Sequence, residues 1–115
     1  MSQWCEGEPE MSRAVVVVAN IYPKSAFRDE VIAALNKTQE QVHANEEGCE
    51  LYALHGNDEH LVMIEKWASP ADLEAHFHAP PFGALGGLLE GKLARDIDIQ
   101  RFQPYPAGTT KQGAL

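Results

Sequence analysis

Two segments in the middle of the sequence alternate apolar and polar residues and are separated by only four residues. They span residues 49–55 and 60–67, and Gly56-Asn57-Asp58-Glu59 lies between them. A period of two is typical of strands with one buried face, and glycine, asparagine and aspartate are the common residues of tight turns. So short a connection predicts an antiparallel hairpin. This hairpin constrains the fold most, because the remaining elements must pack around it.

A strand and a helix are predicted before the hairpin. Residues 14–22 (AVVVVANIY) form a β-branched run without helical periodicity, typical of a largely buried strand, and the run ends at Pro23. A helix then begins at Ser25 and is stopped by Gly48. The residues that share its expected inward face are Phe27, Val31, Ala34, Leu35, Thr38 and Val42.

A second helix is predicted directly after the hairpin. Ser69-Pro70-Ala71-Asp72 provides a capping side chain, a proline for the first helical position and an acid near the positive end of the helix. Leu73, His76 and Phe77 then share the inward face because they are spaced three and four residues apart. Pro80-Pro81 ends this helix.

A further helical piece carries Phe82, Leu85, Leu89 and Leu93 on one face. Each of its glycines costs about 1 kcal/mol of helix stability relative to alanine, so we expect the piece to be kinked or mobile.

Residues 96–102 (DIDIQRF) alternate and predict a last strand. The order β-α-β-β-α-α-β indicates an α+β fold, the ferredoxin-like split βαβ arrangement, with an antiparallel sheet covered by helices on one face. In the middle strand Val62 and Ile64 lie on one side, whereas Met63, Glu65 and Trp67 lie on the other. Because neither side is wholly polar, we expect a homodimer in which two sheets face each other.

The length of 115 residues predicts one core, with an N-terminal extension over residues 1–13, an α+β domain over 14–103 and a polar tail over 104–115. The formal net charge of −8 is spread along the chain, which argues against binding to nucleic acid or an anionic membrane. Cys5 and Cys49 form no metal-binding or redox pattern. With no secretory leader and no membrane-spanning run, we expect a cytoplasmic location with free thiols.

These motifs in combination resemble the antibiotic biosynthesis monooxygenase (ABM) domain. The resemblance covers about residues 13–102 and rests on Glu65-x-Trp67, on the Ser-Pro-Ala-Asp-Leu helix start, on His76 nine residues after Trp67, and on Phe82 with Leu85. It implies a dimeric α/β barrel with one pocket per subunit between sheet and helices. Some members oxidise phenolic or quinol-type polycyclic compounds with O2 and without metal or flavin, and others degrade haem or isomerise a sugar phosphate. Haem-degrading members resemble this chain at Asn20, but they carry an iron-ligating histidine where this chain has Gly86.

His76 and Asn20 are the predicted catalytic residues. His76 suits a general base at neutral pH, although a histidine on an apolar helix face is also typical of a core residue bonded to a backbone carbonyl or to a carboxylate such as Glu65. Asn20 could donate to a substrate oxygen or position O2, or it could cap the turn at Tyr22-Pro23. The sequence does not decide between the catalytic and the structural role of either residue.

Aromatic and polar side chains around these two complete the candidate site. Trp67 and Phe82 could form flat walls for an aromatic ligand or simply pack in the core. The other predicted substrate-binding residues are Phe77, Tyr52, Glu65, Leu85 and Arg101. No metal site is predicted, because His76 and His78 are two positions apart and point to different faces of a helix.

The sequence thus favours a cofactor-independent monooxygenase that oxidises a phenolic, quinol or polyketide-like aromatic substrate with O2. Its expected partners are a second copy, a small aromatic molecule and O2. One alternative is an isomerase of a small carbonyl compound, which uses His76 for proton transfer and needs a more polar pocket with an anion-binding residue. The other is a non-catalytic dimeric binding protein in which His76 is structural.

Overall fold

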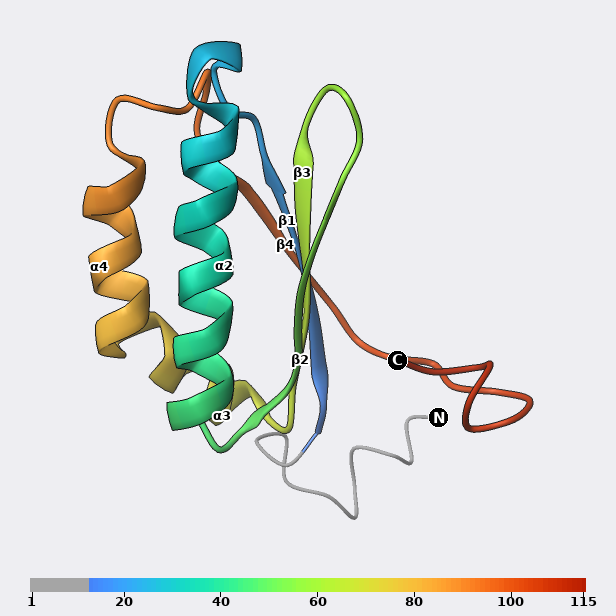
Figure 1. The fold of residues 1–115 in the computed structure, drawn as a ribbon. Coiled ribbons are helices and arrows are strands. Elements are labelled where there is room, and N and C mark those ends of the chain that lie inside the picture. Colours follow the sequence, from blue (N-terminus) through green and yellow to red (C-terminus); the bar gives the residue numbers. More distant parts are fainter. Residues whose placement is uncertain (1–12) are drawn as a thin grey trace.

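The computed structural model describes residues 13–115, so the expected N-terminal extension lies almost entirely outside the described residues. Within this range the chain forms a four-stranded antiparallel sheet with helices on one face (Figure 1). The elements, in chain order, are β1 (Val15–Ile21), the 3₁₀ turn η2 (Ser25–Phe27), α2 (Arg28–Asn45), β2 (Cys49–Gly56), β3 (Leu61–Trp67), α3 (Pro70–Phe77), α4 (Pro80–Leu89) and β4 (Asp98–Phe102). The α+β class and the ferredoxin-like order are confirmed.

The strands lie in the order β2-β3-β1-β4, and every neighbouring pair is antiparallel. The predicted hairpin is present as β2 and β3. Register brings four residues into one row across the sheet, because Tyr52 pairs with Glu65, Glu65 with Val17 and Val17 with Arg101. Residues paired in this way share a face of the sheet. The buried Val17 shows that this face is the one that the helices cover.

The helix α2 buries the stripe that its periodicity predicts, with Val31, Leu35, Thr38 and Val42 in the core. It begins through the 3₁₀ turn and ends at Asn45, three residues before Gly48. Gly48 is required for a different reason from the expected helix stop. A Cβ atom at this position would overlap the side chain of Asp72, so only glycine permits this close approach of the β2 entry to α3.

The helix α3 begins as predicted. Ser69 Oγ accepts a hydrogen bond from the Asp72 backbone N–H at 3.1 Å, and Pro70 occupies the first turn. After it, α4 is continuous from Pro80 to Leu89, so the expected kink is not found within this helix. The burial of Leu85 and Leu89 stabilises α4 despite its glycines.

The expectation that Leu93 continues this apolar face is wrong, because α4 ends four residues earlier and Leu93 forms an isolated bridge with Pro23.

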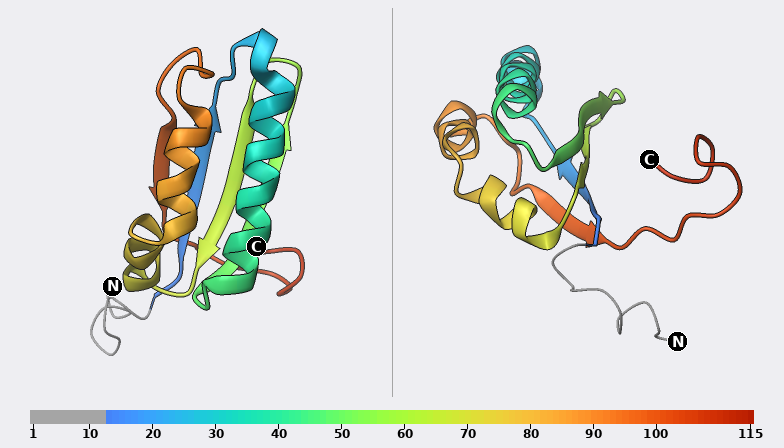
Figure 2. Two further views of the ribbon diagram at one scale, coloured as in Figure 1. Left: turned by 60° about the vertical axis from the view of Figure 1, so that its left-hand side comes forward. Right: turned by 90° about the horizontal axis from the view of Figure 1, so that it is seen from below.

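The three α-helices lie together on one face of the sheet, and the C-terminal segment leaves on the opposite side (Figure 2). The helix α4 packs on α2, and every residue of β4 remains exposed. The helix-facing side of β4 is therefore accessible next to α3 and α4. Among residues 13–115, no helix is both long enough and apolar enough to cross a membrane.

Candidate functional site

A small cavity lies between the sheet and the helices. Its volume is about 30 Å³, which is enough to hold a water molecule but not an aromatic ring. Tyr52 and Glu65 are the polar residues of a lining that is otherwise apolar. The sheet contributes Val17, Ala19, Ile21, Tyr52, Met63, Glu65 and Ile99, the helices contribute Leu35, Phe77, Phe82 and Leu85, and Ile97 precedes β4. Ile99 is 42% exposed, so this cavity borders the accessible side of β4.

Glu65 is a buried carboxyl group in this lining, with 6% of its surface exposed. Strand alternation places Glu65 and Trp67 on the same side of β3, and Trp67 Nε1 donates a hydrogen bond of 2.9 Å to Glu65 Oε1. Burial, with a smaller contribution from the charge of Glu46, raises the pKa of Glu65 to about 7, although the Trp67 hydrogen bond acts in the opposite direction. This carboxyl therefore changes its charge near neutral pH.

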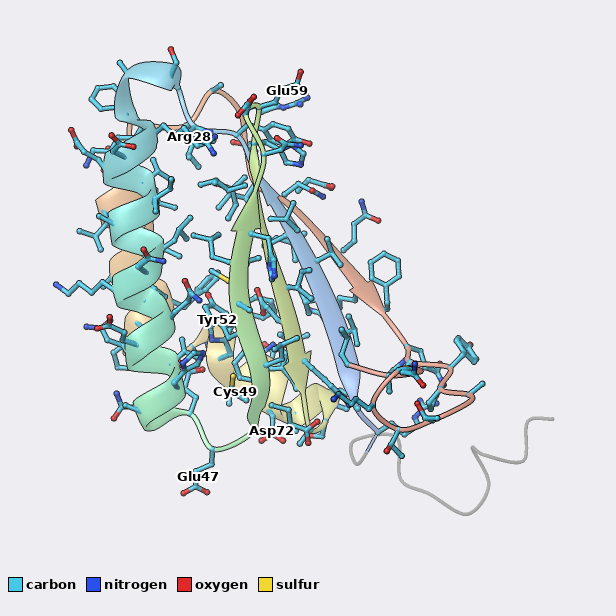
Figure 3. All side chains as sticks on the ribbon, turned by 45° about the vertical axis from the view of Figure 1, so that its right-hand side comes forward. Arg28, Glu47, Cys49, Tyr52, Glu59 and Asp72 are labelled. Carbon is cyan, nitrogen blue, oxygen red and sulfur yellow. The ribbon has the colours of Figure 1, made fainter. Side chains whose placement is uncertain are left out.

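Tyr52 is the second polar residue of the lining and points from β2 into the space between sheet and helices (Figure 3). Its ring makes edge contacts with Trp67 and His76, at centroid distances of 6.2 and 5.3 Å. Burial first, and then the charges of Glu65 and Glu46, hold the pKa of Tyr52 far above its usual range. Its hydroxyl group stays protonated and remains a hydrogen-bond donor at physiological pH.

His76 lies in the last turn of α3 and is 2% exposed, but it is not among the residues that line the cavity. Its Nδ1 is 2.7 Å from Glu46 Oε1, so the partner is the carboxylate that follows α2 and not Glu65. Burial lowers the pKa of His76, and Glu46 opposes this shift. Nδ1 donates to the Glu46 carboxylate, and the ring lies tilted against that of Trp67, with the two ring centroids 4.5 Å apart.

Asn20 is separated from His76 by the sheet. It pairs with Val62 and Asp98 and alternates with the buried Ala19 and Ile21, so its side chain lies on the face away from the helices.

The contacts of Asn20 are made on that outer face. Its Nδ2 donates to Asp98 Oδ2 at 3.2 Å, and its Oδ1 accepts from His60 Nε2 at 3.2 Å. The two predicted catalytic residues are not brought together, and neither the cavity nor the Tyr22-Pro23 turn is where Asn20 makes these hydrogen bonds.

The remaining predicted residues divide into two groups. Phe77, Phe82 and Leu85 line the cavity together with Tyr52 and Glu65. Trp67 is fully buried and does not line the cavity, but its indole N–H group donates a hydrogen bond to Glu65.

Arg101 lies beside the cavity rather than in its lining, with its guanidinium carbon 5.5 Å from the centroid of the Phe77 ring. It lines a neighbouring depression of about 270 Å³ that also includes Arg13.

Sequence reasoning missed Glu46, which is the closest polar partner of His76. No periodicity or motif marks this residue, because it follows the end of α2 and its role comes from the contact of the α2–β2 connection with His76 on α3. In the part of the chain that the structure describes, no three His, Cys, Asp or Glu side chains are grouped as a metal site would require.

A sequence profile of the family described as antibiotic biosynthesis monooxygenase matches residues 14–86. The chain belongs to the ABM family. The matched region runs from β1 into α4 and contains Tyr52, Glu65, Trp67, His76 and Phe82, whereas Arg101 lies beyond it. This membership supports a general monooxygenase-type assignment. No curated protein matches the chain.

Solved structures share the fold of this ABM protein. A proposed antibiotic biosynthesis monooxygenase from Caulobacter crescentus CB15 superposes with a TM-score of 0.78 at 23% identity, over 84% of this chain and 93% of the other. A conserved protein from Methanosarcina mazei Go1 superposes with a TM-score of 0.73 at 26% identity, over 80% of this chain and 93% of the other. A proposed antibiotic biosynthesis monooxygenase from Nitrosomonas europaea superposes with a TM-score of 0.76 at 15% identity, over 88% of this chain and 100% of the other.

Proposed function

We propose that this ABM protein is a cofactor-independent monooxygenase that oxidises a phenolic, quinol or polyketide-like aromatic substrate with O2. The observation that carries the proposal is the cavity between sheet and helices. Its walls are apolar, Phe77 and Phe82 lie on the helix side, and its two polar side chains are a carboxyl that titrates near pH 7 and a neutral tyrosine hydroxyl.

This combination matches what the reaction needs. A phenol or an enolisable ketone reacts with O2 after it loses a proton, because the resulting anion can transfer an electron. The protein must therefore accept the proton, donate a hydrogen bond to a developing anion and exclude water. Tyr52 is our candidate donor, since its hydroxyl stays protonated inside an otherwise apolar lining.

The reaction needs no further reductant. When an anthrone is the substrate, its CH2 group loses both hydrogens and becomes a C=O group. The carbon gives up four electrons, which reduce one oxygen atom of O2 to the new carbonyl oxygen and the other to water. An organic cofactor or redox metal is therefore not required for the electrons to balance.

An aromatic substrate requires the cavity to widen, because about 30 Å³ is too small for a ring. Phe77 and Phe82 are half-buried and contact each other at a centroid distance of 5.1 Å. We propose that these two side chains change rotamer to admit the substrate beside β4. His76 touches both rings, at 5.7 and 5.3 Å between centroids, so we assign it a positioning role instead of direct proton transfer.

The lining also distinguishes the alternatives. An isomerase of a small carbonyl compound is expected to have a more polar pocket with an anion-binding residue, whereas this lining is mostly apolar, with one carboxyl group and no basic side chain. Oxidation of an apolar aromatic molecule therefore fits better. A non-catalytic binding protein would bind such a molecule without consuming O2, which is a direct experimental distinction.

The sheet face away from the helices supports a homodimer as the assembly. Val16, Val18, Val62 and Ile64 lie on this face and are partly buried, and the neighbouring Phe102 is 47% exposed. An apolar sheet face is stabilised when a second layer covers it, and a second copy can supply that layer by two-fold symmetry. The cytoplasm is our proposed location, where the free thiol of Cys49 would stay reduced.

The test is oxygen uptake by the pure, metal-free protein with a panel of hydroquinones and anthrones under air. We expect uptake above the buffer rate for at least one fused-ring member, and loss of that uptake when Phe82→Trp fills the cavity. Leu88→Ala is the matched control, because Leu88 lies on the same helix but is exposed and is not part of the lining. Tight binding without uptake across the whole panel would favour the binding protein instead.

A further inference from the structure

We propose that Glu65 is the general base of the reaction, in place of the histidine that the sequence favours. This inference rests on the proposed function and assigns its proton-transfer step. Glu65 is the carboxyl group in the cavity lining, whereas His76 is outside that lining and its Nδ1 is engaged by Glu46. A substrate between the sheet and the rings of Phe77 and Phe82 would therefore contact the Glu65 carboxyl and not the His76 ring.

A hydrogen bond from Trp67 fixes the position of the Glu65 carboxyl group. Trp67, which is fully buried on the same face of β3, donates its indole N–H to Oε1 of Glu65. Trp67 packs in turn against His76 and Tyr52, which fixes the direction of this hydrogen bond. The second carboxylate oxygen of Glu65, Oε2, is not used by Trp67 and can accept the substrate's proton.

The electrostatic surroundings support the same role. Burial raises the pKa of Glu65 to about 7, which gives a base that is partly ionised at neutral pH and strong enough to hold the proton it accepts. The charged or titratable groups that face it are Tyr52 and Cys49 from β2, Glu46 after α2, His76 from α3 and Arg101 in the same row of the sheet. From α4 the cavity receives only apolar side chains.

Arg101 and Glu65 are separated in their common row by Val17 on β1, so their strands are about 9–10 Å apart. The row therefore places a proton acceptor on β3 and a cation two strands away on β4, with Tyr52 on the other side of Glu65. A planar substrate lying along this row would place its ionisable hydroxyl at Glu65 and its far edge toward Arg101, which lies beside the cavity lining.

The proton steps balance with Glu65 alone. The carboxylate takes one proton from the substrate hydroxyl or its keto tautomer, which leaves an aromatic anion. Two electrons of this anion reduce O2 as a C–O bond forms, and the resulting peroxide anion takes the proton back from Glu65 and becomes a hydroperoxide. Glu65 then removes the proton that remains on the carbon carrying the hydroperoxide as the O–O bond breaks, and passes it to the departing hydroxide. The products are a carbonyl group and one water molecule, and Glu65 is again a carboxylate.

The first test is the pH dependence of anthrone oxidation by the wild type, Glu65→Gln and Glu65→Asp. The wild-type rate should rise about tenfold per pH unit below pH 7 and level off above it. Glu65→Gln should lose at least about 100-fold and show no such rise, and Glu65→Asp should retain intermediate activity. Glu74→Gln on the exposed side of α3 should behave as the wild type. Unchanged oxidation by Glu65→Gln would overturn the inference and leave the monooxygenase proposal standing.

The second test does not depend on turnover. Binding of 4-nitrophenolate at pH 8 should take up close to one proton per site in the wild type, because two negative charges cannot share this small apolar cavity without a proton between them. Glu65→Gln should bind the same phenolate without proton uptake. Proton uptake on phenolate binding by the wild type, together with no oxygen consumption with the hydroquinones and anthrones, would remove the monooxygenase function but keep Glu65 as the proton acceptor. Equal uptake by the wild type and Glu65→Gln would contradict the assignment.

Discussion

Replacement of Glu65 by glutamine should make the protein more stable at alkaline pH. The carboxyl has a pKa of about 7 in the folded chain against an ordinary value of 4.5, so the folded state retains a proton that the unfolded state releases. Stability from this group is complete below pH 4.5 and declines as the pH rises toward 7, because there the unfolded state binds fewer protons. Each unit of pKa difference is worth about 1.4 kcal/mol, so the cost above pH 7 is about 3 kcal/mol.

Glutamine removes this cost because it carries no charge, and its amide oxygen can still accept the hydrogen bond from Trp67. We therefore expect Glu65→Gln to match the wild type near pH 4.5 and to exceed its free energy of unfolding by about 3 kcal/mol at pH 8. Urea denaturation at several pH values measures the difference directly. Glu74→Gln is the control, since that carboxylate is exposed on α3. Parallel stability curves for wild type and Glu65→Gln would refute the claim that the carboxyl is ionised at a cost.

The Trp67 hydrogen bond, the close approach at Gly48 and the outer sheet face can each be tested by one substitution. Trp67→Phe removes the hydrogen bond that lowers the pKa of Glu65, so the midpoint of the pH–rate profile should move to higher pH, whereas an unmoved midpoint would deny Trp67 this role. Gly48→Ala forces a Cβ atom against the Asp72 side chain and should cost about 1–3 kcal/mol of unfolding free energy in urea, and a neutral effect would contradict the close approach. Ile64→Lys places a charge on the outer sheet face and should convert a dimer to monomers in sedimentation, which an unchanged dimer would rule out.

The elements of the fold were predictable where local signals agree with packing. The hairpin of β2 and β3 combines alternation with turn residues, and α3 begins at a serine cap followed by proline. The regular course of α4 was not predictable from propensity, because its glycines argue against a helix and only the burial of Leu85 and Leu89 offsets them.

The site was only partly predictable. Phe77, Phe82 and Glu65 could be placed together from helical spacing and strand alternation, and the structure brings them into one lining. The face of β1 that carries Asn20 could not be chosen, because the strand is apolar on both sides. Only the pairing with β3 fixes which side meets the helices.

The role of His76 depends on a long-range contact that the sequence does not encode locally. Its partner, Glu46, is 30 residues away and lies just after another helix. From the sequence, a histidine on an inward helix face suggested a base, whereas the structure shows its Nδ1 bonded to Glu46 and the residue outside the cavity lining.

The fate of the oxygen atoms tests the central claim most directly. We would incubate metal-free wild type with anthrone under isotopically labelled O2 and weigh the product by mass spectrometry. The account predicts one labelled oxygen atom in the product carbonyl, the other in water, and no hydrogen peroxide. A product without label, or oxidation that occurs only after a metal is added, would contradict it.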